Sequence, residues 1–469
     1  MPQGAAGSLT ALILAAGQGK RMRSTTIKLL HPLWGRPMVA WTLDAVGGLA
    51  PQRLLVVVGH QAAQVSAALD GEQVVRDDIV QDSPRGTGHA VMCARPHLQG
   101  LAGDLLIING DLPLLRESTL ASFLEAHRRA GAVLSVLSTE LTDPTGYGRM
   151  VRDGLRLERI VEHGDATPEE RALHEINCGV YLIRIPTLLK ALDDLGTDNA
   201  QGEYYLTDVV QNLAAAGETV QAVLHPDAGE VLGVNDRREL AQAAAILGNR
   251  KKQDLMTAGV TLLDPDRTYI DPRVQIGADT VVYPNVWMEG ACVLGSGCTV
   301  RPNVHLVNVK VGDRVLLKDH CVIEESEIED EAQVGPFAHL RPGTYLSREV
   351  KVGNFVETKK TTLGQGSKAS HLSYLGDARV GRNVNVGAGT ITCNYDGETK
   401  HLTVLEDGVF IGSDTQLVAP VTVGAGAYVG AGSTITCDVP PGALALSRMA
   451  QRNVEDWVEK KKQRKDEES

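Results

Sequence analysis

A six-residue repeat runs through the second half of the chain, from residue 270 to residue 446, and it limits the possible fold more than any other feature. Apolar residues recur at this spacing in two clean runs: Ile276, Val282, Met288, Leu294, Val300 and Leu306, then Ile411, Leu417, Val423, Val429 and Ile435. Glycine often follows them, and a period of six fits neither a 3.6-residue helix nor a hairpin meander. The repeat predicts a parallel β-helix, in which each short strand points one apolar residue into a three-sided prism.

Residues 9 to 227 alternate between strand-like and helix-like segments instead. The expected strands are 11–15, 54–58, 104–108, 133–138, 178–183 and 220–224, and the expected helices are 38–46, 62–69, 88–94, 119–130, 187–192 and 205–216. This alternation predicts a Rossmann-like α/β domain with an open, mostly parallel sheet and helices on both faces. Such sheets bind ligands beyond the carboxyl ends of their strands, so we expect the chemistry just after Ala15 and Ile108.

Composition argues against several classes of function. The net charge of −12 disfavours a nucleic-acid groove, because phosphate backbones are bound by clustered Lys and Arg. The seven cysteines show no CxxC pair and no Cys/His metal spacing, which favours reduced thiols in a cytoplasmic protein. The apolar stretch 9–16 is too short to span a membrane. We therefore expect a cytoplasmic chain without a nucleic-acid or membrane partner, and its 469 residues should form two or more domains.

A glycine loop, LAAGQGKRM, follows the first expected strand at residues 14–22. Backbone N–H groups of such a loop can approach phosphates closely, and Arg21 and Lys28 can neutralise charge on them. A plain strand-to-helix turn would use the same glycines. The loop is not a Walker A motif, because GxxxxGK followed by Ser or Thr is absent, and it lacks the third glycine and distant acid of a dinucleotide fingerprint.

Two further loops carry candidate chemistry. The strand 104–108 runs into Asn109-Gly110-Asp111, and a carboxylate at a strand's carboxyl end is well placed to hold Mg²⁺ against phosphates. A simple turn aspartate is the alternative. In the loop 81–90, Gln81 could read a base edge and Gly86-Thr87 could lie against a ring, although a capped helix start would look the same.

Together these loops resemble those of the sugar nucleotidyltransferases, and the resemblance continues at residues 146–149, 160–163, 175–179, 202–208 and 233–236. It implies four groups of site residues. These are Leu14, Ala15, Ala16, Gly17, Arg21 and Lys28 for the nucleotide phosphates; Gln81, Gly86 and Thr87 for uracil; Gly148, Glu162 and Asn177 for N-acetylglucosamine; and Asp111 and Asn235 for Mg²⁺. Asn109 and Gly110 are expected to bind substrate as well. Two departures, Lys20 for the family's usual Thr and Ile27 for its frequent Pro, remove no group with an assigned role.

A helical connector is expected next. Asp236-Arg237-Arg238-Glu239 has the Asp-x-x-Glu form of a capping box and opens a helical run through Met256. We therefore expect three parts: a sheet domain at 1–234, a helical arm at 235–258, and a β-helix domain with a charged tail at 259–469. The tail from Trp457 is expected to be frayed and solvated rather than a nucleic-acid arm.

The six-residue repeat is interrupted where chemistry is expected. The segment 393–401 has no repeat and should loop out, and 354–377 carries polar groups that a bare scaffold does not need. Because a β-helix has no closed pocket inside, its active sites should form between neighbouring prisms, so a cyclic homotrimer is expected. His371, beside the coil break, is the candidate base. A zinc site is not favoured, because His305, His320, His339 and His371 show no close paired spacing.

With the first half, this segment resembles the family of bacterial bifunctional N-acetylglucosamine-1-phosphate uridyltransferases/glucosamine-1-phosphate N-acetyltransferases, over residues 9 to 457. The string GAGTITCNYDG at 387–397 is specific to it. The resemblance implies a left-handed β-helix in which His371 is the general base, with Glu357 orienting its ring, for acetyl transfer from acetyl-CoA. It also implies that Arg341, Lys359, Tyr374, Asn385 and Lys400 hold the sugar phosphate, with Ala388, Asn394, Tyr395, Ser413, Ala431 and Arg448 at the acetyl-CoA site.

The implied function is the acetylation of glucosamine 1-phosphate, followed by transfer of UMP from UTP to the product. The end products are UDP-N-acetylglucosamine, for peptidoglycan and lipopolysaccharide, and pyrophosphate. Two alternatives stay open at this point. The chain could be a uridyltransferase alone, with the β-helix as a trimerising or regulatory module, or it could be a non-catalytic nucleotide-sugar sensor.

Overall fold

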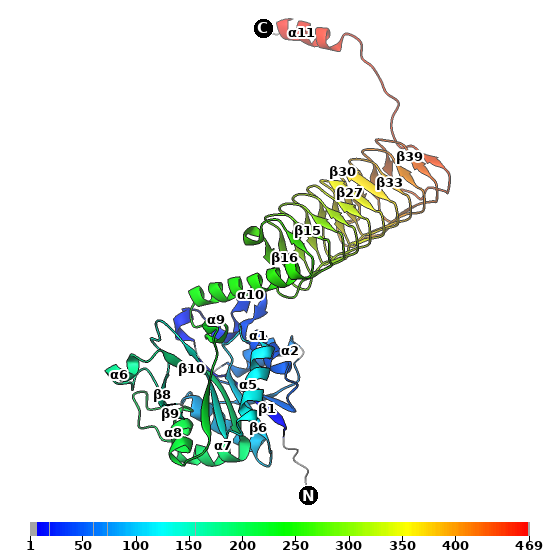
Figure 1. Cartoon of the computed structure of the whole chain (residues 1–469). Helices are drawn as coiled ribbons and strands as arrows, with labels where there is room; N and C mark the ends of the chain where they lie inside the picture. Colours follow the sequence, from blue (N-terminus) through cyan, green and yellow to red (C-terminus); the bar gives the residue numbers. More distant parts are fainter. Residues whose placement is uncertain (1–6, 18, 60, 73, 155, 468–469) are drawn as a thin grey trace. The chain divides into compact units, whose positions relative to one another are not determined.

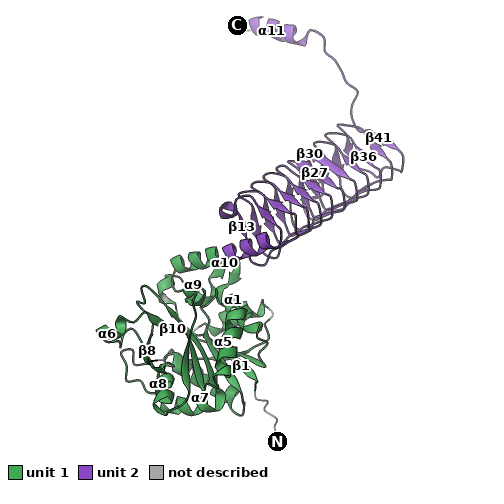
Figure 2. Ribbon diagram, viewed as in Figure 1, with its two compact units in different colours: residues 1–247 green, residues 248–469 purple. Residues whose placement is uncertain are grey.

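The computed structural model describes residues 7–467 except 18, 60, 73 and 155, and it divides into two compact units, residues 1–247 and 248–469 (Figures 1 and 2). In its described residues, unit 1 contains a nine-stranded sheet with the order β11-β7-β10-β6-β1-β4-β5, to which the hairpin β8/β9 is attached through β10. The strands are β1 Leu9–Ala15, β4 Arg53–Val58, β5 Asp77–Val80, β6 Asp104–Asn109, β7 Leu134–Glu140, β8 Arg149–Asp153, β9 Arg156–Val161, β10 Glu175–Arg184 and β11 Val220–Leu224. A small ribbon joins β2 Pro32–Leu33 to β3 Arg36–Pro37.

Helices cover both faces of this sheet, because successive residues of a buried strand point to opposite sides. In β1, Ala11 and Ile13 belong to one buried cluster, which includes residues of α1, α2 and α5, whereas Leu12 belongs to a second, which includes residues of α3, α4, α7 and α8. The helices are α1 Met38–Gly47, α2 Ala62–Asp70, α3 Thr87–Cys93, α4 Arg95–Leu98, α5 Glu117–Arg129, α6 Pro168–Arg171, α7 Ile185–Ala191, α8 Asp208–Ala215, α9 Ala228–Val231 and α10 Arg237–Thr257, with 3-10 turns η1 Lys20–Met22, η2 Lys28–Leu30 and η3 Leu192–Asp194.

The predicted α/β fold is therefore confirmed, and its six expected strands and six expected helices are present with shifted ends. Sequence reasoning missed β5, β8 and β9, whose sequences carry charged residues at several positions. The sheet is also more mixed than a plain Rossmann arrangement, because β10 runs antiparallel to both β6 and β7. This reversal brings the amino end of β10 to the same sheet edge as the carboxyl ends of β1 and β6.

Unit 2 is a three-sided β-helix, in which the described strands form three parallel sheets and, from β12 to β40, every third strand falls in the same sheet. The first sheet contains β12 Thr261–Leu262, β15 Val281–Val282, β18 Thr299–Val300, β21 Leu316–Leu317, β24 Gln333–Val334, β27 Lys351–Asn354, β30 Lys368–His371, β33 Asn385–Val386, β36 Phe410–Ile411, β39 Tyr428–Val429 and β41 Leu444–Ala445. The second contains β13 Tyr269–Ile270, β16 Trp287–Glu289, β19 His305–Val307, β22 Val322–Glu324, β25 His339–Leu340, β28 Glu357–Lys359, β31 Tyr374–Gly376, β34 Ile391–Cys393, β37 Gln416–Val418 and β40 Thr434–Ile435. The third contains β14 Gln275–Ile276, β17 Val293–Leu294, β20 Lys310–Val311, β23 Glu327–Ile328, β26 Tyr345–Leu346, β29 Thr362–Leu363, β32 Ala378–Val380, β35 Thr403–Leu405 and β38 Val421–Val423.

The prism is filled by the residues of the six-residue repeat, as predicted: every apolar residue of the two clean runs is buried in one continuous core. Two inward positions are polar instead. Thr358 and Thr392 are buried, and their hydroxyls form hydrogen bonds with Thr344 Oγ1 at 2.9 Å and with the Gly376 carbonyl at 3.0 Å. Both lie in the polar region of the prism, so the repeat continues there with hydrogen-bonded rather than apolar contacts.

The expected loop at 393–401 is present, because Asn385 of β33 pairs with Phe410 of β36 across the longest coil of the prism. The charged tail differs from expectation: it contains helix α11, Trp457–Glu467, whose described side chains are all exposed. Every helix in the described part of the chain is too short or too polar to cross a lipid bilayer. The seven cysteines, all within the described residues, are free thiols.

Candidate active sites

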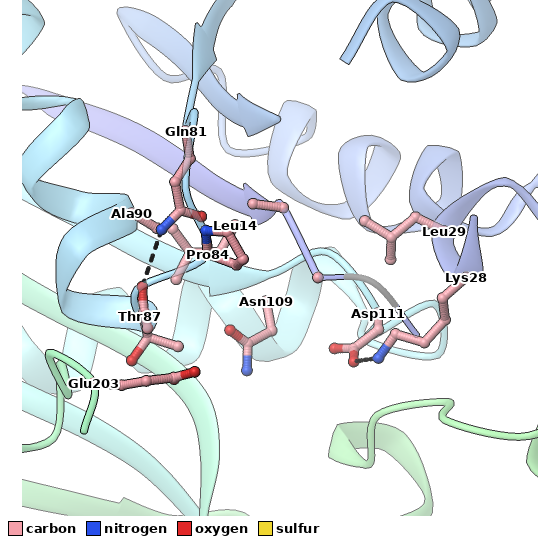
Figure 3. Close-up of a pocket in the computed structure, with 13 residues that line it drawn as sticks. Leu14, Lys28, Leu29, Gln81, Pro84, Thr87, Ala90, Asn109, Asp111 and Glu203 are labelled. Carbon is pink, nitrogen blue, oxygen red and sulfur yellow. Dashed lines mark hydrogen bonds and ion pairs between the residues drawn. The ribbon is translucent and has the colours of Figure 1, made fainter. Parts of the chain in front are cut away.

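A cavity of about 600 Å³ lies at the carboxyl ends of the central strands of unit 1 (Figure 3). It is bounded by the loops after β1, β5 and β6. In the sheet, β6 is the neighbour of β1, and β4 lies between β1 and β5. Most of the residues predicted for the nucleotide line it: Leu14, Ala16, Gly17, Lys28, Gln81, Gly86, Thr87, Asn109 and Asp111. Strands that end at one edge thus gather residues from three separate parts of the sequence.

One end of this cavity carries opposite charges in contact. The Lys28 ammonium forms an ion pair with Asp111 Oδ2 and also donates to Asn235 Oδ1 at 3.2 Å. The Arg21 guanidinium donates to the same Asn235 Oδ1 at 2.9 Å. The oxygens of the two predicted metal ligands therefore converge on one cation. A hard divalent ion prefers oxygen ligands and completes its shell with phosphates and water, so the donor set fits such an ion.

Close packing of the glycine loop puts Lys28 in this position. Gly19 has φ +62°, a backbone conformation that L side chains rarely adopt. A Cβ at Gly19 would lie 2.3 Å from Lys28 Cβ. The loop can therefore pass directly over the Lys28 backbone only because residue 19 has no side chain. The Lys20 side chain, one of the two departures from the family pattern, lies outside the described residues, and Ile27 is buried.

The other end of the cavity is closed by two chain segments held together by backbone hydrogen bonds. Tyr204 N–H donates to the Arg85 carbonyl at 2.8 Å, and Gly88 N–H donates to the Tyr204 carbonyl at 2.7 Å. The Gln81 amide donates to the Gly86 carbonyl at 3.2 Å, which fixes its orientation at the cavity wall (Figure 3). Glu203 also lines this cavity. It belongs to the motif at residues 202–208, but the sequence analysis predicted no role for it.

A second cavity of about 310 Å³ shares the wall formed by Leu14, Thr87, Asn109 and Asp111. The residues predicted for the sugar, Gly148, Glu162 and Asn177, all line it, as do Arg21 and Asn235. Pairing explains their meeting. Arg149 of β8 lies opposite Val161 of β9, which sets Gly148 and Glu162 at the open end of one hairpin, and the reversed β10 supplies Asn177. Of the residues predicted in unit 1, Ala15 and Gly110 line neither cavity.

The sugar-side cavity contains a carboxylate that is largely removed from water. Burial raises the pKa of Glu162, and the nearby Asp165 and Asp208 carboxylates raise it further. The Thr207 hydroxyl donates to Glu162 Oε1 at 3.3 Å and works in the opposite direction. Burial, then Glu239 and Asp111, raise the pKa of the Tyr147 phenol to about 12, so the phenol stays a hydrogen-bond donor at neutral pH.

Sequence reasoning missed several residues that line the second cavity: Thr145, Gly146, Tyr147, Gly179, Tyr181, Thr207, Gly233 and Glu239. Most of them belong to motifs that were already part of the family resemblance. Their closeness in sequence to a predicted site residue could therefore have identified them as cavity residues. Glu239 is different, because its sequence position suggests a helix cap rather than a cavity residue.

In unit 2, His371 ends β30 with an exposed ring, and it lies beside Asn354, its register partner on β27. Its Nδ1 is 2.6 Å from Asn354 Oδ1. The sequence interpretation gave this orienting contact to Glu357; within one chain the hydrogen-bond partner of the ring is Asn354. Glu357 accepts a hydrogen bond from Arg341 at 2.8 Å. Its strand, β28, belongs to the second sheet of the prism, whereas β30 with His371 belongs to the first.

Three cations gather near this edge. Lys400, and after it Arg341, lowers the pKa of the Lys359 ammonium, because like charges lie close together in a solvent-exposed group. Lys400 is carried by the loop after β34 and pairs with Tyr395 across a short antiparallel bridge. Clustered cations without enough carboxylates between them are suited to a phosphate group.

The same loop brings Asn394 next to Tyr374 of β31, another predicted residue. A Cβ at Gly376 would meet both the Tyr374 hydroxyl and the Asn394 amide nitrogen, so these two groups lie side by side above it. Asn394 Nδ2 donates to Asp377 Oδ2 at 2.5 Å, which ties the start of the loop to the coil below. Asn385 begins β33, the strand that pairs with β30.

Four of the six residues predicted for acetyl-CoA form a column on successive coils. Asp414 N–H donates to the Ala388 carbonyl at 2.6 Å, and Gly432 N–H donates to the Ser413 carbonyl at 2.9 Å. Arg448 Nη1 then donates to the Ala431 carbonyl at 2.8 Å. Stacking of equivalent corner residues is what a β-helix imposes, and it turns four positions spread over 61 residues into one continuous strip of surface.

Two domain families match the chain, one in each unit. The MobA-like NTP transferase domain matches residues 11–175, and the bacterial transferase hexapeptide (six repeats) matches residues 402–437. Fold and sites therefore define a nucleotidyltransferase joined to a hexapeptide-repeat transferase.

Full-length relatives identify the family. The chain is 51% identical over 451 residues to the bifunctional protein GlmU of Pelobacter propionicus, covering 96% of this chain and 98% of the relative. It is 51% identical over 453 residues to that of Trichlorobacter lovleyi, with 96% and 98% covered, and 48% identical over 451 residues to that of a Geobacillus species, with 96% and 97% covered. The chain belongs to the family of the bifunctional protein GlmU. The predicted family, the fold class with its left-handed β-helix, and the pairing of a nucleotidyltransferase with an acyltransferase are confirmed.

Proposed function

We propose that unit 1 transfers UMP from UTP to N-acetylglucosamine 1-phosphate, and that unit 2 makes this acceptor from glucosamine 1-phosphate and acetyl-CoA. The observation that carries the first half is the pair of adjoining cavities. A nucleotide-sized space and a sugar-sized space share a wall that contains Asp111, so two substrates can meet beside one charged corner. The product, UDP-N-acetylglucosamine, supplies peptidoglycan and lipopolysaccharide synthesis. We assign the protein itself to the cytoplasm.

In unit 1 the sugar-phosphate oxygen attacks the α-phosphorus of UTP, and the bond to the departing pyrophosphate breaks. This reaction needs alignment and charge neutralisation more than a protein nucleophile. Arg21 and Lys28 neutralise phosphate charge, while Gln81, Gly86 and Thr87 select uracil and Gly148, Glu162 and Asn177 hold the sugar. Asp111 and Asn235 would hold a divalent ion, which we assign as Mg²⁺ and which supplies positive charge beside the phosphates.

In unit 2 we assign the base to His371. The Asn354 side-chain oxygen Oδ1 accepts hydrogen bonds and does not donate them, so this contact favours the tautomer of the neutral ring with its proton on Nδ1 and with Nε2 free to accept a proton. Nε2 takes a proton from the glucosamine nitrogen as that nitrogen attacks the thioester carbonyl of acetyl-CoA. The carbon–sulfur bond then breaks, and the leaving thiolate takes the proton from the imidazolium, so that free thiol is released. The cations Arg341, Lys359 and Lys400 hold the sugar phosphate, with Tyr374 and Asn385 beside them.

The remaining assignments in unit 2 concern acetyl-CoA. Asn394, Tyr395 and the column of Ala388, Ser413, Ala431 and Arg448 form its site, and the backbone near Ala388 stabilises the oxyanion.

We propose a homotrimer in which a second copy covers this edge. An apolar ladder rises along the corner that carries His371: Phe337, Phe355 and Leu372 are 48%, 55% and 61% exposed. The rings of His320, Phe337 and Phe355 stack with centroid distances of 4.9 and 5.4 Å. A contiguous exposed apolar surface is typical of an interface, and a base open to solvent cannot exclude water from a thioester.

One experiment tests both activities and the rival functions. The chain is given glucosamine 1-phosphate, acetyl-CoA, UTP and Mg²⁺, each is omitted in turn, and thiol and pyrophosphate release are followed. A parallel reaction supplies N-acetylglucosamine 1-phosphate with UTP and Mg²⁺. We expect thiol release without UTP, and pyrophosphate release that depends on prior acetylation. Pyrophosphate release from N-acetylglucosamine 1-phosphate without any thiol release would leave a uridyltransferase with a structural β-helix. Neither product would leave a sensor.

A further inference from the structure

Glu239 is a carboxylate in the sugar-side cavity that neither the sequence motifs nor the proposed reaction uses. It lies in the first turn of α10. In a capping box, the acid three residues after the cap returns a hydrogen bond to the backbone N–H of the cap residue. Half of this pattern is present, since Glu239 N–H donates to Asp236 Oδ1 at 2.9 Å.

The returning hydrogen bond goes to a different residue. Glu239 Oε2 accepts from the backbone N–H of Asn235 at 2.5 Å, one residue before the cap. Asn235 is the residue whose side-chain oxygen faces Arg21 and Lys28 at the charged corner. The carboxylate therefore contacts the backbone of a candidate metal ligand rather than only completing a helix end.

The Asn235 side chain is held from the other side as well. Its Nδ2 donates to the Gly233 carbonyl at 3.1 Å, which turns Oδ1 toward Lys28 and Asp111. With its backbone N–H fixed by Glu239 and its amide fixed by Gly233, Asn235 has little freedom to rotate away from the corner. An outer group that orients a metal ligand commonly changes metal affinity about 10- to 100-fold.

The charge of Glu239 also reaches the site. Glu239, Asp111 and Tyr147 all line the second cavity. After burial, the charges of these two carboxylates raise the pKa of the Tyr147 phenol, as expected for groups that face the same small space. A second negative charge near the corner would favour a bound cation, in addition to any effect on geometry.

We propose that Glu239 is a positioning residue for the divalent ion of the uridyltransferase site. It holds Asn235 in its ligating orientation, so the first turn of α10 is part of that site. The proposal deepens the proposed function and depends on it, since it assumes that Asp111 and Asn235 bind the metal.

The test is Mn²⁺ binding by the full-length chain, followed by electron paramagnetic resonance, together with the Mg²⁺ dependence of pyrophosphate release. We expect Glu239→Ala to weaken Mn²⁺ binding by about 10- to 100-fold and to raise the Mg²⁺ requirement in parallel. Glu239→Gln keeps an oxygen that can accept from the Asn235 N–H, so it should restore most of the loss. Acetyl transfer by the same molecules should stay at the wild-type rate, which reports an intact unit 2, and the thermal unfolding transition of unit 1 reports that unit 1 is folded in each variant.

Asp236→Ala is the matched control, because it removes the side-chain cap of the same helix turn and leaves the Glu239 carboxylate. It should lower the melting temperature of unit 1 without changing Mn²⁺ affinity. A Glu239→Ala variant that melts earlier but binds Mn²⁺ like the wild type would reduce Glu239 to a helix cap and overturn the proposal. If wild type and Asp111→Asn bind Mn²⁺ equally, the metal site itself is wrongly assigned, which is a failure of the proposed function instead.

Discussion

The two units build their candidate sites in opposite ways. In unit 1, loops at one edge of the sheet enclose two cavities, and most of the residues predicted for nucleotide and sugar line them within a single chain. In unit 2, the interior is filled by the repeat residues, and His371 with its neighbours lies on an exposed edge. Adjacent loops of an open sheet leave space between them, whereas a prism packed with its own side chains leaves none. The difference predicts one site that works alone and one that needs a neighbour.

We expect Asp111→Asn to produce the largest difference between the activities of the two units. The substitution removes the negative charge that faces Lys28 and would hold the metal, whose charge stabilisation is worth several kcal/mol in such reactions. We expect pyrophosphate release to fall roughly 10⁴-fold, by the relation of barrier to rate. Thiol release from acetyl-CoA should be unchanged. If the variant transfers UMP at the wild-type rate in Mg²⁺, the assignment of Asp111 as a metal ligand is wrong.

The reciprocal variant, His371→Ala, should affect only unit 2. Loss of a positioned general base lowers a rate by about 10²- to 10⁴-fold. Thiol release should fall by that amount and recover in part at high pH, where the substrate amine loses its proton without help. Uridyl transfer with N-acetylglucosamine 1-phosphate is the control in the same tube. Full acetyl transfer by this variant would refute the role of His371.

Phe355→Asp tests whether the exposed site needs a second copy. A charge in the middle of the apolar ladder would have to be buried without a partner in the assembly, which strongly opposes association. We expect the variant to sediment as smaller species and to lose acetyl transfer by about tenfold or more at micromolar concentration. Leu224→Asp, at an exposed apolar position of unit 1, is the matched control and should leave assembly intact. Full acetyl transfer by monomers would show that one prism is sufficient.

Glu162→Gln tests the enclosed site through pH. Because burial raises the pKa of Glu162 in the folded chain above its unfolded value, the charged form destabilises unit 1 at neutral pH, and this effect disappears as the pH falls through the raised pKa. The variant should therefore melt at higher temperature than the wild type at pH 8 but not at low pH. Its KM for the sugar phosphate should rise about tenfold, since a hydrogen bond to a charged acceptor is lost. An unchanged KM would place the sugar elsewhere.

His401→Gln should have the smallest effect. His401 Nε2 lies 2.6 Å from Asp396 Oδ2 across the loop that carries Asn394, Tyr395 and Lys400. This contact, with two backbone N–H donors, holds the pKa of Asp396 well below its usual range, so the carboxylate stays charged and keeps its partners until the medium is strongly acidic. Because an exposed ion pair contributes little, we expect acetyl transfer to fall by no more than about fivefold. A loss as large as that of His371→Ala would mean that His401 takes part in the chemistry.

Local patterns in the sequence predicted much of this molecule. The six-residue repeat specified the prism and its core, because inward residues must recur with the period of the coil. The alternation of strands and helices specified the sheet, and loops that follow strands, such as the one with Asp111, were predicted as candidate sites. The family resemblance added Gly148, Glu162 and Asn177, which no local pattern had selected.

Relations between distant segments could not be predicted in this way. The reversal of β10, the hairpin that sets Gly148 beside Glu162, and the contact of His371 with Asn354 rather than Glu357 depend on strand register and on which face of the prism a residue occupies. The same is true of Glu239, which reads as a helix cap and instead holds Asn235. The sequence by itself determined periodicities and the residue types at each turn, since these follow from local backbone geometry. The tertiary structure alone decided which of those residues meet, because that depends on pairing and packing across the whole chain.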